Sequence, residues 1–275
     1  MYSIEAETAR SARLYPVGET FAFARVHMPE TWVFDQPDAA SARQTQYTYG
    51  EGLRLLAEQG DFYLAQSLRD AYSGWVAKSA ITLRDDEPHA VTWRTRSVAP
   101  VTRDASMKSP HLTTLPPDAC LAIDDEQGDY LHIAGLGWLH RHHTIRTDQH
   151  SDIVMAASEH IGRSYVWGGR GVAGLDCSAL AQLSYRRAGH NIPRDSDLQQ
   201  HFLRKFHDSI ALDALAAGDL IYIPGHVMIA ATADSVIHAT AYHMQTAYEL
   251  LDTVLARYRH DGGSDDNIKA YRWRE

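Results

Sequence analysis

The tripeptide Asp176-Cys177-Ser178 places the strongest demand on how this chain can fold. It follows a glycine pair, Gly168-Gly169, and opens a run with helical composition that ends at Gly189. A cysteine in the first turn of a helix lies where the helix dipole and unpaired backbone N–H groups stabilise a thiolate. Because the thiolate is the attacking form of cysteine, the sequence predicts a nucleophile at the start of a helix.

The chain has one other cysteine, Cys120, in a part of different composition. The sequence alone does not exclude a disulfide between Cys120 and Cys177. However, a chain of 275 residues with two cysteines does not resemble a short secreted fold held together by disulfides. We expect Cys120 to be a buried thiol with apolar neighbours and assign it no role.

Two histidines follow in a segment that predicts three short strands. Pro224-Gly225 separates a strand over 220–223 from one that begins at His226, and a third covers 235–240. If the last two strands form an antiparallel hairpin, His226 and His238 lie opposite each other or nearly so. Their Cβ atoms would then be roughly 4.5–5.5 Å apart.

A thiol with two such histidines can supply a nucleophile, a base and a group that orients the base. In a chain with 16 histidines, the simpler interpretation of any one of them is a structural residue. The joint arrangement with Cys177 favours the catalytic interpretation.

The order of these motifs resembles that of the NlpC/P60 peptidases, which have a papain-like core. The resemblance covers residues 146–275. Ala179 and Met228 depart from the family pattern, since glycine is usual at both positions, and the sequence does not determine what Met228 does to the pocket beside the base. The matching stretches are Tyr165–Gly169, Asp176–Leu180, Pro193–Ser196, Gly218–Leu220, Gly225–Val227 and His238.

The resemblance implies that Cys177 attacks a carbonyl, that His226 moves the proton and that His238 orients His226. The hydroxyl of Tyr165 and the backbone N–H of Cys177 would stabilise the oxyanion.

Four more positions match residues that line the family's substrate groove. They also have structural alternatives: Ser178 bonding the first helical turn, and Asp195 or Ser196 capping a helix that begins near Asp197. The four positions are Asp176, Ser178, Asp195 and Ser196.

Residues 1–145 contain short alternating segments separated by turns, which is typical of small all-β modules. Glu58–Phe62 and Glu126–Tyr130 share the pattern Glu-Gln-Gly-Asp-aromatic, and Gly-Trp-apolar follows each, at Gly74 and Gly137. This resembles two bacterial SH3 modules in tandem, with one irregular β domain as the alternative.

We therefore predict an α+β protein in which two small SH3-like barrels precede a papain-like NlpC/P60 catalytic domain. The expected domains are residues 1–80, 81–145 and 146–275.

This arrangement resembles the murein-peptide endopeptidases of the cytoplasm, which cleave the bond between γ-D-glutamate and an L-diamino acid. In that subgroup the first SH3-like module reads a free amino-terminal L-Ala. Glu51 and Tyr72 are our candidates for that contact because a buried ammonium needs an acceptor. Alternatively, Glu51 and Tyr72 are turn and core residues of the module. The sequence does not distinguish diaminopimelate from lysine at the cleaved bond.

Composition limits the partners. Net charge is −9, and acidic residues outnumber basic ones in both halves, which argues against nucleic acid. No stretch approaches the ~18 apolar residues that span a bilayer, and the first residues do not form a secretory signal. We expect a cytoplasmic monomer that binds a small murein peptide and no membrane.

We expect no metal or other cofactor. The run His140–His143 lacks a thiol at ligand spacing and is expected to be a solvated linker. Gly168–Gly171 lacks the ending of a phosphate loop and is expected to be a turn that lets backbone approach the substrate.

Two other functions remain open. The first is a non-catalytic protein that only holds wall peptides, against which the complete set of Cys177, His226 and His238 speaks. The second is a thiol amidase or acyltransferase on the same core, which would favour an apolar groove that this acidic chain does not indicate.

Overall fold

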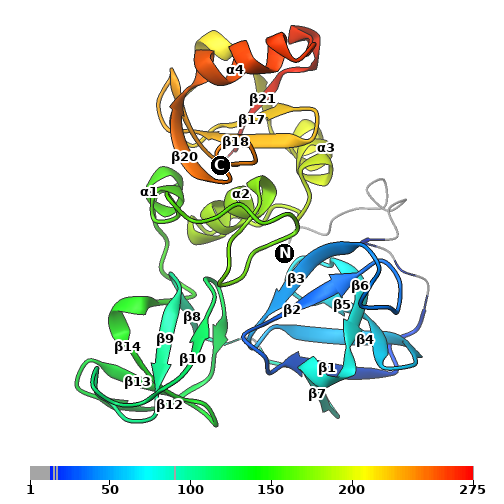
Figure 1. Cartoon of the computed structure of the whole chain (residues 1–275), viewed down its shortest axis with the longest axis vertical. Coiled ribbons are helices and arrows are strands. Elements are labelled where there is room, and N and C mark those ends of the chain that lie inside the picture. Colours follow the sequence, from blue (N-terminus) through cyan, green and yellow to red (C-terminus); the bar gives the residue numbers. More distant parts are fainter. Residues whose placement is uncertain (1–12, 15, 17, 90, 275) are drawn as a thin grey trace. The chain divides into compact units, whose positions relative to one another are not determined.

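The computed structural model describes residues 13–14, 16, 18–89 and 91–274 (Figure 1). The chain divides into two compact units. The β unit extends to Gln149 and also contains Arg170–Val172. The C-terminal unit contains His150–Gly169 and the chain from Ala173 onward. The finer division into three domains stays a prediction.

The first part of the β unit is one antiparallel sheet in the order β3-β2-β6-β5-β4-β1-β7. Alternation builds its core: Leu53 and Leu55 are buried on β4, and Arg54 between them is exposed. The strands are β1 (Ala22–Val26), β2 (Glu30–Phe34), β3 (Arg43–Thr48), β4 (Gly52–Gln59), β5 (Phe62–Ser67), β6 (Ser73–Ala77) and β7 (Ile81–Arg84).

The second part of the β unit has two sheets, in the orders β10-β9-β14-β13-β12 and β11-β8-β15. Within the described chain no pairing joins the end strands of these sheets or of the first one, so the predicted barrels are not closed. The strands are β8 (Trp93–Thr95), β9 (Ala99–Thr102), β10 (His111–Leu115), β11 (Cys120–Leu121), β12 (Ile123–Gln127), β13 (Tyr130–Ile133), β14 (Gly137–His140) and β15 (Thr144–Arg146).

The repeated sequence pattern has a structural counterpart. Gly60 and Gly128, both with positive φ, each lie in the tight turn of a hairpin. Gln59 pairs with Phe62 across one turn, and Gln127 pairs with Tyr130 across the other. The following Gly-Trp strands, β6 and β14, then pair with β5 and β13. The region is therefore all-β and built from two related hairpins.

Two expectations for the β unit are wrong. His140 ends β14 and residues 141–143 form the 3-10 turn η2 (Arg141–His143), so the histidine run belongs to the module and is not a linker. Cys120 is half-buried, and Nη2 of Arg69 lies 3.4 Å from its sulfur, so its surroundings are not purely apolar.

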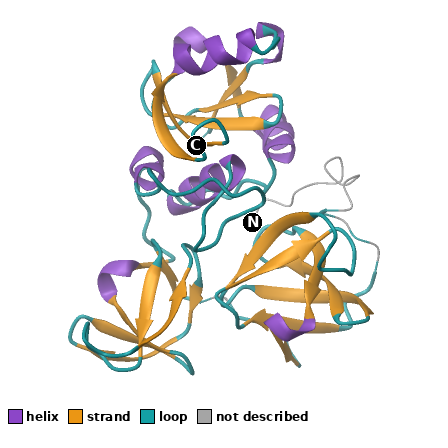
Figure 2. Cartoon of the chain, viewed as in Figure 1, coloured by secondary structure: helices purple, strands orange, loops and turns teal. Residues whose placement is uncertain are grey.

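The described part of the C-terminal unit combines four α-helices with one antiparallel sheet in the order β16-β21-β17-β18-β19-β20 (Figure 2). Neither the described helices here nor those elsewhere in the described chain are long and apolar enough to cross a membrane. The elements are α1 (Ile153–Ser158), α2 (Cys177–Arg187), α3 (Ser196–Phe206), β16 (Asp208–Ile210), β17 (Leu220–Ile223), β18 (His226–Ala230), β19 (Ser235–Thr240), β20 (Gln245–Leu250), α4 (Leu251–His260) and β21 (Lys269–Arg272).

Helices cover both faces of this sheet, with α2 on one side and α4 on the other (Figure 1). Strand β18 shows why: Val227 and Ile229 pack in the core beside α2, while Met228 and Ala230 pack in the core beside α4. Such a two-sided strand has a continuous apolar sequence. Met228 is therefore a core residue on the α4 side.

The predicted bounds of this segment are confirmed. Strands β17 and β19 span the predicted residues, and β18 begins at His226. The β18–β19 hairpin pairs Ile229 with Ile237. Helix α2 ends as predicted, because Gly189 has φ +90° and lets the N–H of His190 reach the carbonyl of Tyr185.

Acid should destabilise the C-terminal unit through His160, which follows α1 and is buried. Burial, with Arg163 and Arg187 nearby, lowers the pKa of His160 to about 3. The unfolded chain binds a proton at this residue below about pH 6.5. Stability is therefore lost as the pH falls, by about 2 kcal/mol for this residue between pH 7 and pH 5.

Calorimetry of the full chain at pH 7 and pH 5 tests this. His160→Gln should show a smaller drop in Tm than the parent, whereas the exposed His260→Gln should show the parental drop. Equal drops for all three proteins would contradict the role of His160.

Candidate active site

Cys177 is the first residue of α2, and Asp176 caps the helix. Oδ1 of Asp176 accepts the N–H of Ala179 at 2.8 Å, which satisfies one of the amides that a helix start leaves unpaired. This cap fixes the point at which the chain turns into the helix. The position of the thiol therefore follows from the Asp-Cys-Ser order.

A buried ion pair between Asp176 and Arg194 holds the motifs together. Nη1 and Nη2 of Arg194 each lie 2.9 Å from an oxygen of Asp176, and Nη1 also donates to the hydroxyl of Ser178 at 2.8 Å. The Arg194 side chain is fully buried. A guanidinium fork on a carboxylate gives this contact direction as well as strength.

The glycine pair joins the same network. Gly168 has φ +71°, and its N–H donates to Oδ2 of Asp176 at 3.0 Å. The carbonyl of Gly169 accepts Nη2 of Arg194 at 3.3 Å, and a Cβ on Gly169 would come within 2.9 Å of Val166. The glycines are thus required for the turn that meets Asp176 and Arg194.

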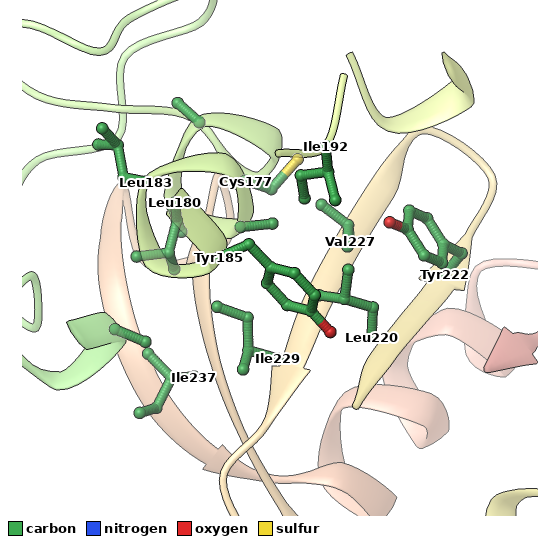
Figure 3. Packing of buried hydrophobic residues seen from close by; sticks show 14 of the residues in the cluster. Cys177, Leu180, Leu183, Tyr185, Ile192, Leu220, Tyr222, Val227, Ile229 and Ile237 are labelled. Carbon is green, nitrogen blue, oxygen red and sulfur yellow. The ribbon is translucent and has the colours of Figure 1, made fainter. Parts of the chain in front are cut away.

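The thiol of Cys177 lies in the core beside α2, with Val227 and Ile229 in the same cluster (Figure 3). Burial raises the pKa of Cys177 to about 12, and the Asp176 carboxylate adds to the rise. Hydrogen bonds from the backbone N–H groups of Val227 and Ser178, together with Arg194, oppose it. The expected thiolate is therefore wrong for the free protein, because loss of solvent outweighs the helix terminus.

The two predicted histidines meet across the hairpin. Nε2 of His226 lies 2.9 Å from Nδ1 of His238, and Nε2 of His238 lies 2.9 Å from Oε2 of Glu249 on β20. Burial lowers the pKa of His226 to about 3, and His238 lowers it further. Burial also lowers the pKa of His238. Both imidazoles are therefore neutral at physiological pH.

These histidines line a cleft of about 820 Å³ within the C-terminal unit. Tyr165, Trp167 and residues of α4 form other parts of its wall. Among the described residues Cys177 is not part of the lining, but Val227, whose N–H meets its sulfur, directly follows His226. At the start of β18, His226 therefore lines the cleft while the next residue, Val227, contacts the thiol.

Tyr165 connects the thiol with the same cleft. Its ring packs against the core that contains Cys177. Burial raises the pKa of Tyr165 to about 12, with further contributions from Cys177 and Asp176. The phenol therefore keeps its proton at neutral pH and can donate a hydrogen bond.

The other predicted groove residues have structural contacts. Ser178 is buried and donates to Oδ1 of Asp176 at 3.1 Å. Asp195 occupies the N-cap position of α3, which begins at Ser196, but its side chain makes no capping hydrogen bond. Asp195 and Ser196 are both half-buried. Substrate roles for Asp176, Ser178, Asp195 and Ser196 stay predictions.

Glu51 and Tyr72 are both buried in the β unit. Nη2 of Arg170 lies 2.9 and 3.0 Å from the two oxygens of Glu51, and the hydroxyl of Ser67 and the N–H of Thr48 also donate to them. An ammonium group would have to displace one of these donors. The substrate-amine role of Glu51 and Tyr72 stays a prediction.

Sequence reasoning missed Arg194 and Glu249. Arg194 stands inside the matched Pro193–Ser196 stretch, so its signal was present but was assigned only to its neighbours. Glu249 lies in no motif, and only the β19–β20 pairing brings it to His238.

Fold and site together define an α+β domain of the papain-like type, with a thiol on a helix start and a histidine pair on strands. Residues 162–260 match the NlpC/P60 family, and residues 33–81 match the bacterial dipeptidyl-peptidase SH3 domain. The chain therefore carries an NlpC/P60 peptidase-family domain preceded by a bacterial SH3 domain.

Curated relatives include dipeptidyl-peptidase 6 of Lysinibacillus sphaericus, which is 23% identical over 83% of this chain and 92% of its own length. The gamma-D-glutamyl-L-lysine dipeptidyl-peptidase of Bacillus subtilis is 26% identical over 65% of this chain and 63% of its own.

Solved structures agree on the fold. An NlpC/P60 family protein from Bacillus cereus has a TM-score of 0.75 at 17% identity. The match covers 92% of this chain and 99% of that protein's chain. An NlpC/P60 endopeptidase from Photobacterium damselae subsp. piscicida has a TM-score of 0.61 at 12% identity, over 96% of this chain and 76% of its own.

Breaking the Asp176–Arg194 pair should destabilise the C-terminal unit strongly. Arg194→Met leaves a buried carboxylate without its cation, so we expect a loss of about 3–5 kcal/mol in urea unfolding followed by circular dichroism. Arg259→Met is the matched control, because Arg259 is 46% exposed and pairs with Asp265 on the surface. Its loss should stay below about 1 kcal/mol. Equal losses for the two variants would show that burial does not strengthen the pair.

Proposed function

We propose that this protein is a cysteine peptidase that cleaves the bond between γ-D-glutamate and a diamino acid in small murein peptides. The observation that carries the proposal is the buried thiol at the start of α2 beside a strand that begins with a paired histidine. The NlpC/P60 match over residues 162–260 supports the hydrolase class.

In the proposed mechanism, the thiol of Cys177 is neutral until substrate arrives. His226 removes its proton as the sulfur attacks the γ-glutamyl carbonyl carbon, and a thioester forms as the amine leaves with that proton. Water then attacks the thioester carbon while His226 takes a proton from it, the C–S bond breaks, and that proton returns to the sulfur of Cys177 as the acid product is released. His226 is neutral at neutral pH, so one of its ring nitrogens has the lone pair that a general base needs.

Two donors are proposed for the oxyanion. The first amides of α2 have no partner within the helix, and the N–H of Cys177 is one of them. The protonated phenol of Tyr165 is the second. His238 orients His226 in this scheme.

The substrate class rests on the relatives. One is named a dipeptidyl-peptidase and another a gamma-D-glutamyl-L-lysine dipeptidyl-peptidase, and both names fit removal of L-Ala-γ-D-Glu from a wall peptide. We propose that this chain acts on such released peptides in the cytoplasm, in wall-peptide recycling.

Incubation with L-Ala-γ-D-Glu-diamino acid tripeptides tests the activity. Mass spectrometry should detect free L-Ala-γ-D-Glu with the parent protein and none with Cys177→Ala. Diaminopimelate and lysine substrates run in parallel separate the two diamino acids, and an N-acetylated substrate should resist cleavage. If Cys177→Ala cleaves as fast as the parent, the proposed nucleophile is wrong. If the parent and Cys177→Ala bind the tripeptides equally well and neither protein cleaves them, the non-catalytic alternative holds.

Tyr165→Phe removes only the proposed oxyanion donor. Loss of such a donor typically costs about 3–4 kcal/mol of barrier, so we expect kcat to fall about 10²–10³-fold with a smaller change in KM. The measurement is steady-state release of dipeptide. An unchanged kcat would reject this role for the hydroxyl.

A further inference from the structure

One carboxylate in the C-terminal unit lies at the far end of the histidine pair. Oε2 of Glu249 lies 2.9 Å from Nε2 of His238, 2.7 Å from Nη2 of Arg257 and 3.1 Å from Nε2 of His243. Its side chain is only 12% exposed. Neither the sequence motifs nor the proposed mechanism uses this residue.

Glu249 is ionised in this setting. Burial raises its pKa, but hydrogen bonds from Arg257, His238 and His243 outweigh that effect, and the pKa falls to about 2. An ionised carboxylate can only accept hydrogen bonds. The short contact with Nε2 of His238 therefore requires a proton on that nitrogen.

The proton on Nε2 of His238 determines which ring nitrogens of the two histidines donate and which accept. A neutral imidazole carries one N–H and one lone pair, so a proton on Nε2 of His238 leaves its Nδ1 as an acceptor. Nε2 of His226, 2.9 Å from that Nδ1, must then be the donor. Nδ1 of His226 is left with the lone pair.

We propose that Glu249 is a positioning residue that sets the tautomers of both His238 and His226, so that Nδ1 of His226 is the basic nitrogen. The role in catalysis rests on the proposed function, whereas the tautomers themselves do not. Arg257 and His243 support the arrangement, since both donate to the same oxygen and keep it an acceptor.

The alternative is that Glu249 is only a structural partner of Arg257, which joins β20 to α4. A structural role predicts lower stability when the carboxylate is removed but no change in the protonated nitrogen of His226. The two roles therefore differ in a property that can be measured without substrate.

The experiment uses the full chain labelled with ¹⁵N-histidine, in which long-range ¹H–¹⁵N spectra identify the protonated ring nitrogen. Signals are assigned from those that disappear in His226→Gln and His238→Gln. In the parent protein at pH 7 we expect both histidines to be single Nε2–H tautomers. An Nδ1–H tautomer or a mixture at His226 in the parent would overturn the proposal, whatever the activity.

Two substitutions at position 249 separate charge from hydrogen bonding. Glu249→Leu removes the acceptor, so an Nδ1–H population should appear at His226 and kcat should fall about 10²-fold, with KM within roughly threefold. Glu249→Gln can keep an amide oxygen facing the three donors, so it should retain the parental tautomers and most of kcat.

Asp213→Asn, an exposed carboxylate in the turn η3 (Leu212–Ala214), is the control and should leave tautomers and rates unchanged. Parental tautomers in Glu249→Leu would refute the proposal. If that variant does not fold, the parent and Glu249→Gln spectra still decide it. A tautomer shift without cleavage of any murein peptide would leave the proposal standing and reject the proposed substrate instead.

Discussion

The buried ion pair between Asp176 and Arg194 is the contact on which the site depends. It joins the glycine turn before α2, the cap of α2 and the loop before α3 through one carboxylate and one guanidinium. Three segments between residues 168 and 194 thereby meet at one buried corner. A buried charge without its partner is very costly, so Asp176 and Arg194 each depend on the other in this fold.

The chemistry of this corner is decided by burial. A helix start alone favours a thiolate, yet removal of solvent and a neighbouring carboxylate keep Cys177 protonated. The same burial keeps His226 and His238 neutral. Neutral side chains avoid uncompensated charges in the core, and in the proposed mechanism the proton leaves the thiol during the attack instead of before it.

The sheet positions the apolar and polar side chains of the C-terminal unit. Strand alternation gives β18 one row of side chains for the core beside α2 and another for the core beside α4. The strands then align His226, His238 and Glu249 in a line of hydrogen bonds that ends on Arg257. Each ring nitrogen in this line can act only as a donor or only as an acceptor, so Glu249, a residue outside every motif, can determine the tautomer of His226.

Much of this protein could be predicted from the residues alone. Proline, glycine and apolar spacing located the strands around His226 and His238, and the Asp-Cys-Ser order located α2, because turn and cap preferences act over a few residues. The open sheets, the core position of Met228, the neutral thiol and the contact of Glu249 with His238 could not be predicted in this way. Those features depend on strand pairing and on the solvent that packing removes, and both quantities exist only once distant segments have met.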